Sequence, residues 1–317
     1  MISALIVTCN SERCIGPCLE SLRRQAPEAE MVVVDNGSRD GTVEAARRVP
    51  GVKLIVSESN LGFAGAVNRA ARESSGEALL LLNPDTLCRT SLAPLEEALQ
   101  GSENVAAVAP QLVDSAGVFQ RGFAIRRLPT RAALLCEILL LNRLFPNNPV
   151  NRRYRCLDFD PETAAEVEQP AGACLLVRRS SFEQCGGLDE RFYPLWFEDV
   201  DLCRRLRARG GIIRYEPRVV VEHAGAHSLE GVTFSEKQVY WYRNLLYYVR
   251  KNYGRGTEAL VRGALLLGMG LRIAAELLAV VLDRKTPVAV RRDRLRAYGR
   301  AALVSISAGE SRPRAGN

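Results

Sequence analysis

Only two histidines occur in this chain of 317 residues, His223 and His227, and only four of its 43 basic residues are lysine. The nine cysteines form no C-x-x-C pair, so a structural zinc site of the usual spacing is excluded. The thiols are therefore expected to be free, in a reducing compartment. Low-complexity segments and internal repeats are absent, and hydrophobic residues make up 47% of the chain, which is enough for a sizeable core.

Two common nucleotide-binding motifs are also missing. A G-x-G-x-x-G turn would follow the first strand, where the sequence has residues 9–13, Cys-Asn-Ser-Glu-Arg. No phosphate loop ends in Gly-Lys-Ser or Gly-Lys-Thr, and a sugar nucleotidyltransferase would need a Gly-rich basic loop that is not seen. The net charge of +7 reflects an arginine bias of a solvated surface, so no nucleic-acid partner is expected.

No targeting segment is evident. The N-terminus runs straight into an apolar strand, and Asn10, Glu12 and Arg13 follow before a signal-peptide core could form. In the C-terminal part the longest unbroken apolar run is 263–271, shorter than the roughly 20 residues that span a bilayer. We therefore expect a cytoplasmic protein.

Four consecutive leucines, Leu79 to Leu82, predict a strand that is buried on both faces, as in a parallel sheet under helices. Pro84 cannot donate to a strand ladder, so the strand should end at Asn83 and present Asp85 beyond its carboxyl end. Ligands bind at that edge of open α/β sheets. A carboxylate there is a hard oxygen ligand that suits Mg²⁺ or Mn²⁺ carrying a diphosphate.

Strands and helices alternate around this stretch, which is typical of a doubly wound α/β sheet. The remaining pattern predicts strands at 3–7, 31–34, 52–56, 105–109, 117–123, 172–177 and 219–221. It predicts helices at 14–24, 131–145, 180–184 and 202–209, others opening near 42 and 62, and a polar excursion over 146–168.

Polar residues follow the first three strands. Thr8 and Asn10 follow the first, Asp35 the second and Asn60 the third. An Asx-turn or helix cap is a competing interpretation of Asp35. Gly62 and Gly65 would let backbone approach a ligand closely, and a helix beginning there would offer N–H groups to phosphate oxygens.

Three acids, Glu198, Asp199 and Asp201, lie beside Trp196 at the expected start of a helix. Crowded carboxylates are expected at a helix start or at a functional site. Asp201 fits the first helical turn, whereas Glu198 and Asp199 fit a cleft. His223 directly follows the strand at 219–221 and is a candidate second metal ligand beside Asp85, while structural and ligand roles are balanced for His227.

Taken together, these motifs resemble the inverting family 2 glycosyltransferases of the GT-A fold, in order and spacing over about residues 2 to 228. The rhamnosyltransferase-like branch, which uses Asn-Pro-Asp where others have Asp-x-Asp, is the most similar. Cys9 stands where the family usually has Tyr, and Leu188 where it usually has Phe. The motifs are Thr8-Cys9-Asn10, residues 34–38, residues 60–65, Asn83-Pro84-Asp85, residues 187–190, residues 198–201 and His223.

The resemblance implies a GT-A catalytic domain over 1–228, a Rossmann-like mixed sheet with a nucleotide-sugar half (about 1–110) and an acceptor half (about 111–228). It implies that Asp35 accepts the N3–H of uracil or thymine, that Asp85 and His223 hold a divalent metal ion, and that Asp199 is the catalytic base. The other implied roles are donor contacts by Thr8, Asn10, Asn60, Gly62, Gly65 and Asn83, and acceptor or sugar contacts by Trp196, Glu198 and Asp201.

The implied function is the transfer of a sugar, rhamnose by the branch, from a dTDP- or UDP-sugar to a glycan or lipid-linked acceptor in cell-surface polysaccharide synthesis. A non-catalytic nucleotide-sugar-binding component of an assembly complex is the alternative. Such a binder would need no acid at Asp199.

The C-terminal region, 229–317, has a different character. An aromatic and basic amphipathic helix is expected at 236–253, then an apolar segment at 259–282 and an arginine-rich one at 283–300. Contact with an anionic membrane through 236–300, with the protein peripheral on the inner face of the plasma membrane, is one interpretation. Packing on the catalytic domain or on a second subunit in a homodimer is the other.

Overall fold

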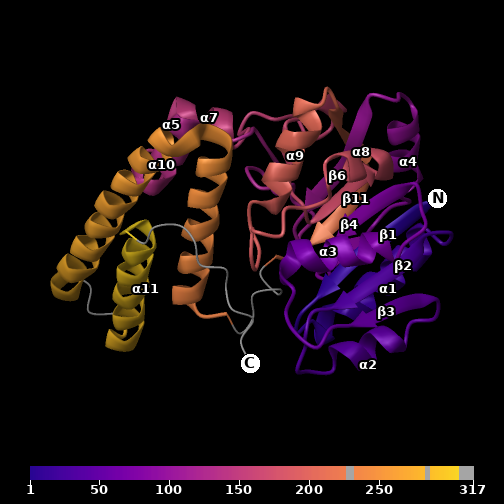
Figure 1. Cartoon of the computed structure of the whole chain (residues 1–317), viewed down its shortest axis with the longest axis horizontal. Coiled ribbons are helices and arrows are strands. Elements are labelled where there is room, and N and C mark those ends of the chain that lie inside the picture. Colours follow the sequence, from indigo (N-terminus) through magenta and orange to yellow (C-terminus); the bar gives the residue numbers. More distant parts are fainter. Residues whose placement is uncertain (226–231, 283–285, 307–317) are drawn as a thin grey trace.

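The computed structural model describes residues 1–225, 232–282 and 286–306. His227 lies outside the described residues. A sheet flanked by helices forms one side of the molecule in Figure 1, and a group of long C-terminal helices forms the other.

A nine-stranded mixed sheet has the order β3-β2-β1-β4-β10-β6-β11-β5, with β8 beside β11. The first four strands in space are parallel, whereas β10 runs antiparallel to both of its neighbours. The strands are β1 (Ile2–Thr8), β2 (Glu30–Asp35), β3 (Val52–Val56), β4 (Ala78–Leu82), β5 (Thr86–Cys88), β6 (Val105–Val113), β8 (Ala165–Glu166), β10 (Cys174–Arg178) and β11 (Ile212–His223). A separate ribbon pairs β7 (Ile125–Arg126) with β9 (Gln169–Pro170).

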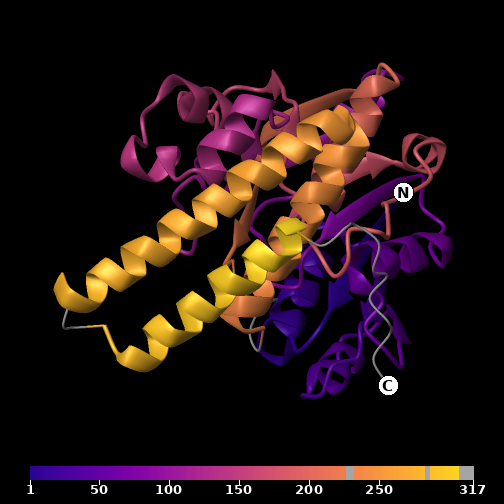
Figure 2. The same ribbon diagram turned by 60° about the vertical axis from the view of Figure 1, so that its left-hand side comes forward.

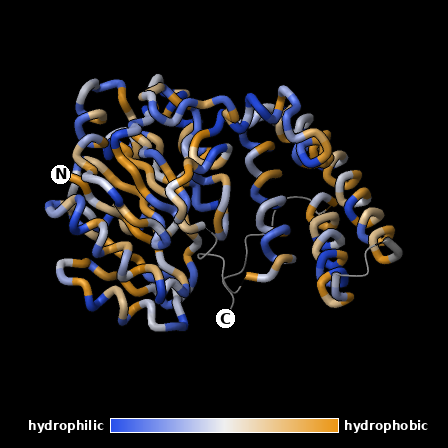
Figure 3. The backbone as a smooth tube through the Cα atoms, turned by 180° about the vertical axis from the view of Figure 1, so that it is seen from behind, coloured by the Kyte–Doolittle hydropathy of each residue, from blue (hydrophilic) through white to orange (hydrophobic). Residues whose placement is uncertain are grey.

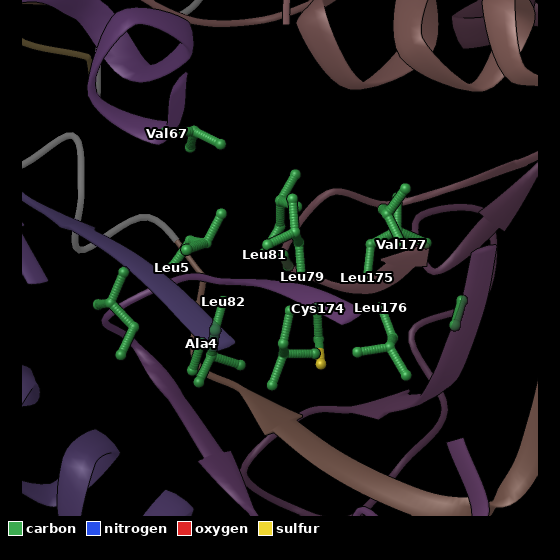
Figure 4. Packing of buried hydrophobic residues seen from close by; sticks show 14 of the residues in the cluster. Ala4, Leu5, Val67, Leu79, Leu81, Leu82, Cys174, Leu175, Leu176 and Val177 are labelled. Carbon is green, nitrogen blue, oxygen red and sulfur yellow. The ribbon is translucent and has the colours of Figure 1, made fainter. Parts of the chain in front are cut away.

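The leucine strand β4 lies inside this sheet between β1 and β10, and Leu79 to Leu82 are at most 1% exposed, as predicted for a strand buried on both faces. Figure 4 shows the side chains of Leu79 and Leu81 on the face toward Val67 and that of Leu82 on the other. The strand ends at Leu82, one residue before the predicted end, and Asn83 begins the turn. Hydrophobic residues likewise run along the strands in Figure 3.

The helices over residues 12–208 connect these strands. They are α1 (Glu12–Gln25), α2 (Thr42–Arg47), α3 (Gly62–Arg72), α4 (Ala93–Gln100), α5 (Arg131–Ile138), α6 (Leu141–Leu144), α7 (Pro149–Tyr154), α8 (Arg179–Gln184) and α9 (Glu198–Ala208). Some of them flank the sheet, whereas α5 and α7 lie beside the long C-terminal helices (Figure 1).

Three strand predictions differ from the structure. Residues 117–123 form a loop whose only described pairing is a single bridge between Val113 and Phe119. Pro110, just beyond the predicted end of the strand at 105–109, lies inside β6 opposite Glu216, where the register with β11 shifts. Such an irregularity tolerates a proline because a ladder hydrogen bond is already interrupted there. The predicted strand at 219–221 is only part of β11, which has 12 residues.

The predicted helix at 131–145 is two helices, separated at Leu140, which has a φ of 64°. No glycine or proline marks this break. A C-terminal helix packs against it, with Arg272 Nη1 donating to the Ile138 carbonyl at 2.7 Å. A Cβ on Gly268 would lie 2.5 Å from the same oxygen, so this close packing requires glycine.

Two long C-terminal helices, α10 (Phe234–Leu282) and α11 (Val288–Ile306), complete the molecule. Non-helical dihedrals at Gly254 divide α10 into two halves, and Figure 2 shows its second half running beside α11. A second hydrophobic core joins both halves of α10 to α5 and to residues 192–200.

By length and composition, part of α10 between Phe234 and Val280 could cross a membrane, and 17% of its most apolar 18-residue window is buried. Judged by its length alone, the apolar run at 263–271 is too short to span a bilayer. That criterion was too strict, because isolated arginines interrupt a run while the mean hydropathy of the window stays high.

Candidate active site

The carboxyl edge of the parallel strands brings Thr8 and Asp35 together, because these two residues are register partners in β1 and β2. Thr8 Oγ1 donates to Asp35 Oδ1 at 3.1 Å, and Ser38 N donates to Asp35 Oδ2 at 3.0 Å. Both side chains are buried. The hydrogen bond from Ser38 N shows that Asp35 does hold the turn after β2, as the competing interpretation predicted. Each carboxylate oxygen still retains a second lone pair for a donor such as an imide N–H.

Asn10 and Asn60 lie near this edge and organise its loops. Asn10 has a φ of 52°, and its Oδ1 accepts a hydrogen bond from Arg39 N at 2.9 Å. Asn60 Oδ1 accepts from Asn36 Nδ2 at 2.9 Å and from Gly62 N at 2.8 Å. The side-chain oxygens of both asparagines therefore already accept hydrogen bonds from neighbouring loop residues.

Gly62 begins α3 and has a φ of +74°, a conformation that favours glycine. A Cβ there would lie 2.7 Å from Tyr193 Cδ2, and Phe63 N donates to Pro194 O at 2.7 Å. The group that lies close to Gly62 is thus the side chain of Tyr193, whereas the sequence pattern predicts the phosphate groups of a ligand there. At Gly65 a Cβ would make only ordinary contacts, 3.4 Å from that of Leu61 just before the same helix.

Asp85 and His223 lie side by side because β5 pairs with β11, which sets His223 opposite Thr86. The Ala224 amide donates to the Asp85 carbonyl at 3.0 Å, and His223 Nε2 lies 3.7 Å from Asp85 Oδ1. Asp85 is only 5% exposed, and its Oδ1 has no hydrogen-bond partner among the described residues. A buried carboxylate oxygen without a donor is costly unless a cation neutralises it.

The imidazole of His223 is held in the form that binds metals. Gln120 Nε2 donates to the His223 carbonyl at 2.8 Å, which places Gln120 Oε1 3.2 Å from His223 Nδ1. We assign the proton to Nδ1 from this network, so the Nε2 lone pair faces Asp85. Burial lowers the pKa of His223, opposed by the charge of Asp85, and the ring stacks on Phe123 with centroids 5.2 Å apart.

These two side chains fit a divalent cation with an incomplete protein shell. No group of three or more His, Cys, Asp or Glu side chains arranged for a metal occurs in the described part of the chain. Mg²⁺ and Mn²⁺ are commonly held by one or two protein ligands together with substrate phosphates and water. The pair therefore matches a metal that arrives with, or is completed by, a diphosphate.

Asp199 lies in the first turn of α9, where backbone groups orient its carboxylate. Gly172 N donates to Oδ2 at 3.1 Å, and Val200 N donates to Oδ1 at 2.8 Å. A Cβ on Gly172 would lie 2.9 Å from that of Asp199, so this approach requires glycine. Burial raises the pKa of Asp199, while the two amides and the charge of Arg126 oppose the rise.

One short segment connects the metal pair to Asp199. Asn83, two residues before Asp85, donates its amide to the Ala173 carbonyl at 2.9 Å. The preceding residue, Gly172, is the one that donates to Asp199. The Asn-Pro-Asp tip and the acid of α9 therefore meet across residues 172–173, at the same edge of the sheet as the pair of Thr8 and Asp35.

The sequence profile described as Glycosyl transferase family 2 matches residues 3–186, more than half of the chain. The chain belongs to this family. An N-acetylglucosaminyl-diphospho-decaprenol L-rhamnosyltransferase of Mycobacterium tuberculosis is 35% identical over 234 residues, covering 67% of this chain and 74% of the relative. Rhamnosyltransferase WbbL of Escherichia coli is 23% identical over 250 residues, covering 76% of this chain and 89% of the relative.

Solved structures confirm the GT-A fold of this glycosyltransferase. The mannosyltransferase PcManGT from Pyrobaculum calidifontis, in complex with GDP-Man and Mn²⁺, superposes with a TM-score of 0.56 at 19% identity, covering 96% of this chain and 86% of the other. GalNAc-T7 with UDP, GalNAc and Mn²⁺ gives 0.53 at 15% identity, covering 78% and 50%.

The neighbouring acid of the glycosyltransferase, Glu198, is buried, and its Oε2 has no partner in the described structure. Burial and the charge of Asp199 raise the pKa of Glu198 well above its ordinary value. Just before it, Trp196 and Phe197 both have positive φ, 77° and 75°, a conformation that strains non-glycine residues. The partly buried Trp196 packs edge-on against Trp241 of α10, with centroids 5.6 Å apart.

Helix α10 holds this strained loop. Asn244 Nδ2 donates to the carbonyls of Leu195 at 2.7 Å and of Trp196 at 3.4 Å, and Arg243 donates to that of Tyr193. Asn244 is itself 1% exposed. The C-terminal helices therefore support the loop that positions Asp199.

Asp201 does not face an acceptor, contrary to the assignment made from sequence. Its side chain is fully buried, and Arg205 Nε and Lys251 Nζ each lie 2.7 Å from a carboxylate oxygen. Lys251 also contacts Asp189 at 2.7 Å. This ion-pair network joins α9 to α10, so Asp201 supports the structure.

Sequence reasoning missed several residues at the site: Gln120, Phe123, Arg126, Gly172 and Asn244. Gln120 and Phe123 lie in the loop that was predicted to be a strand, and they contact His223. None of the five stands in a recognisable motif. The one available signal was Gly172, a glycine beside a predicted strand, which can mark a close backbone approach.

Proposed function

We propose that this glycosyltransferase is a metal-dependent, inverting enzyme that transfers rhamnose from a dTDP- or UDP-sugar to a lipid-linked diphosphate acceptor. The observation that carries the proposal is the chain of contacts that links the pair of Asp85 and His223 to Asp199 through Asn83 and residues 172–173. The 35% identical rhamnosyltransferase supports the choice of sugar and acceptor.

Each residue has a defined task in this proposal. Asp35, fixed by Thr8, accepts the imide N–H of the pyrimidine. Asp85 and the Nε2 atom of His223 hold the divalent ion, which when bound neutralises charge on the departing nucleoside diphosphate. Asp199 takes the proton of the acceptor hydroxyl as its oxygen attacks the anomeric carbon opposite the leaving group, which inverts the configuration.

The function is tested with purified full-length protein, Mn²⁺, a panel of nucleotide sugars and an N-acetylglucosaminyl-diphospho-lipid acceptor. We expect transfer of rhamnose from the dTDP- or UDP-sugar, with inverted anomeric configuration in the product by NMR. Efficient transfer from a different sugar would overturn the rhamnose assignment. Donor binding without transfer or hydrolysis would favour the non-catalytic alternative.

Asp35→Asn is expected to raise the KM for the dTDP- or UDP-sugar about tenfold or more. The change removes the negative charge from a side chain that accepts a hydrogen bond from Thr8 and, in this proposal, another from the pyrimidine. Hydrogen bonds to charged groups contribute about 1.5–3 kcal/mol. Asp40→Asn is the matched control, because Asp40 accepts hydrogen bonds at the start of α2, from Thr42 N at 3.1 Å. An equal rise in both variants would contradict the role of Asp35.

We further propose that the C-terminal helices bind an anionic membrane surface peripherally. Large apolar side chains on the second half of α10 and on α11 are exposed, and arginines lie among them. Glu276 of α10 pairs with Arg294 of α11 at 3.1 Å, and a bilayer core would have to take up that pair if the helix crossed it. Shallow insertion leaves the charged groups in the headgroup region.

Full-length protein is expected to co-sediment with vesicles containing phosphatidylglycerol and to bind them less tightly after Leu267→Ser with Leu278→Ser. These leucines are 58% and 62% exposed, and burying a leucine contributes about 1.5–3 kcal/mol, so we expect a fall of at least tenfold. Val118→Ser, at a residue that is 59% exposed in a loop of the catalytic half, is the control. Wild-type protein that stays in solution with such vesicles would contradict the proposal.

A further inference from the structure

A cavity of about 270 Å³ lies between α5, α7 and both halves of α10, next to Phe197. Three arginines line it, Arg126, Arg155 and Arg272, against one carboxylate, that of Glu137. The walls therefore carry an excess of positive charge, in a place that the donor site does not use.

The guanidinium groups retain capacity for a ligand. Arg155 Nη2 lies 3.2 Å from each carboxylate oxygen of Glu137, while its Nε is buried without a hydrogen-bond partner among the described residues. Arg272 Nη1 donates to Ile138 O and Gly268 O at 2.7 and 2.9 Å, which fixes the fork at the cavity wall. Planar, fixed guanidinium forks bind phosphate oxygens in pairs.

The cavity lies beside Asp199, the proposed catalytic base. Arg126 is near enough to Asp199 for its charge to lower the pKa of that carboxyl, and Phe197 precedes Asp199 by two residues. Arg126 also stacks over Phe123, whose other contact is the ring of His223. An anion in the cavity would thus be adjacent to the position of the acceptor hydroxyl.

Exposed apolar residues occur near the elements that line the cavity. Leu144 and Phe145, at the end of α6, are 67% and 63% exposed, and Leu271, next to Arg272, is 46% exposed. The helix α6 follows α5, whose last residue, Ile138, lines the cavity together with Arg272. An acceptor with a charged diphosphate and an apolar tail would match the arginine-lined cavity and the exposed apolar residues, respectively.

We propose that this cavity binds the diphosphate of a sugar-diphospho-lipid acceptor, with Arg155 and Arg272 contacting its oxygens. The inference rests on the proposed function and adds to it the acceptor's recognition element. It predicts that the enzyme selects its acceptor by the diphosphate and that the two arginines set the acceptor KM.

The test compares two detergent-soluble acceptors, an N-acetylglucosaminyl-diphosphate with a short isoprenoid chain and an octyl N-acetylglucosaminide without the diphosphate. Arg272→Gln and Arg155→Gln are expected to raise the KM for the diphosphate acceptor about ten- to a hundredfold, since each removes charge-assisted hydrogen bonds. Transfer to the octyl glycoside is expected to be weak, and it should stay unchanged together with donor KM and donor hydrolysis. Arg255→Gln, at an exposed arginine of the same helix, is the matched control.

Three outcomes would overturn the inference. The first is an unchanged KM for the diphosphate acceptor in both variants. The second is an equal loss with the octyl glycoside or in Arg255→Gln, which would indicate a structural effect. The third is a variant that loses only its binding to phosphatidylglycerol vesicles, which would make the cavity a site for phospholipid headgroups. Failure of the proposed function is distinct, because wild-type protein would then neither transfer sugar nor hydrolyse the donor.

Discussion

Asp199→Asn is expected to lower kcat for sugar transfer by about 10²- to 10⁴-fold, the usual contribution of a general base. The amide keeps the shape of the carboxylate but cannot take a proton from the acceptor hydroxyl. Donor binding should persist, because the contacts to Asp199 come from Gly172 and Val200 and not from the nucleotide edge. Steady-state kinetics with the lipid-linked acceptor, beside titration with the nucleoside diphosphate, separates the two effects.

The same group sets the pH dependence of the reaction. A base works only when it is ionised, and burial raises the pKa of Asp199 above that of an ordinary aspartate. Transfer should therefore fall as the pH drops through this raised value, at a higher pH than an exposed aspartate would give. The acid limb of the kcat profile should disappear in Asp199→Asn.

Glu198→Gln is the matched control for the base. Burial and the charge of Asp199 raise the pKa of Glu198 well above its ordinary value, so glutamine mimics the protonated form that this environment favours. We expect this variant to retain most of its activity and its acid limb. A loss of transfer in Glu198→Gln with full activity in Asp199→Asn would assign the proton transfer to Glu198 instead.

Much of the sheet could be predicted because its signals are local. Leu79 to Leu82 are buried on both faces, so an unbroken apolar run is sufficient to identify β4 and the edge that carries Asp85. The edge strand β3 also has the predicted bounds, although its residues are only partly buried and Lys53 interrupts its apolar run. Asp85 and His223 were paired from their chemistry, and the pairing of β5 with β11 brings them together.

What the sequence could not show depends on contacts between distant segments. Gln120 orients His223 from a loop whose alternation of residues imitates a strand. Asp201 looked like a site residue, but Lys251, 50 positions later, makes it part of an ion-pair network. No glycine or proline marks the break at Leu140, and the contact beside it comes from α10, where Gly268 packs against the Ile138 carbonyl.

Removal of the metal is the second large effect. Treatment with EDTA is expected to lower transfer by the wild-type enzyme by at least about 10²-fold, with recovery on addition of Mn²⁺, because charge stabilisation of the leaving diphosphate is among the largest catalytic contributions. Asp85→Asn should mimic this loss and should weaken binding of Mn²⁺ in the presence of UDP. His223→Gln should weaken that binding too, since it removes the Nε2 lone pair beside Asp85 Oδ1.

Titration of Mn²⁺ by electron paramagnetic resonance measures the metal affinity independently of turnover. Asp158→Asn serves as the matched control, because Asp158 is an exposed carboxylate that pairs with Arg152 at 2.6 Å. It should bind Mn²⁺ and transfer sugar as the wild type does. The buried Oδ1 of Asp85 has no donor among the described residues, so losing the cation should also destabilise this edge of the sheet. Transfer at the untreated rate in EDTA, with Mn²⁺ binding unchanged in Asp85→Asn, would show that these side chains hold no catalytic metal.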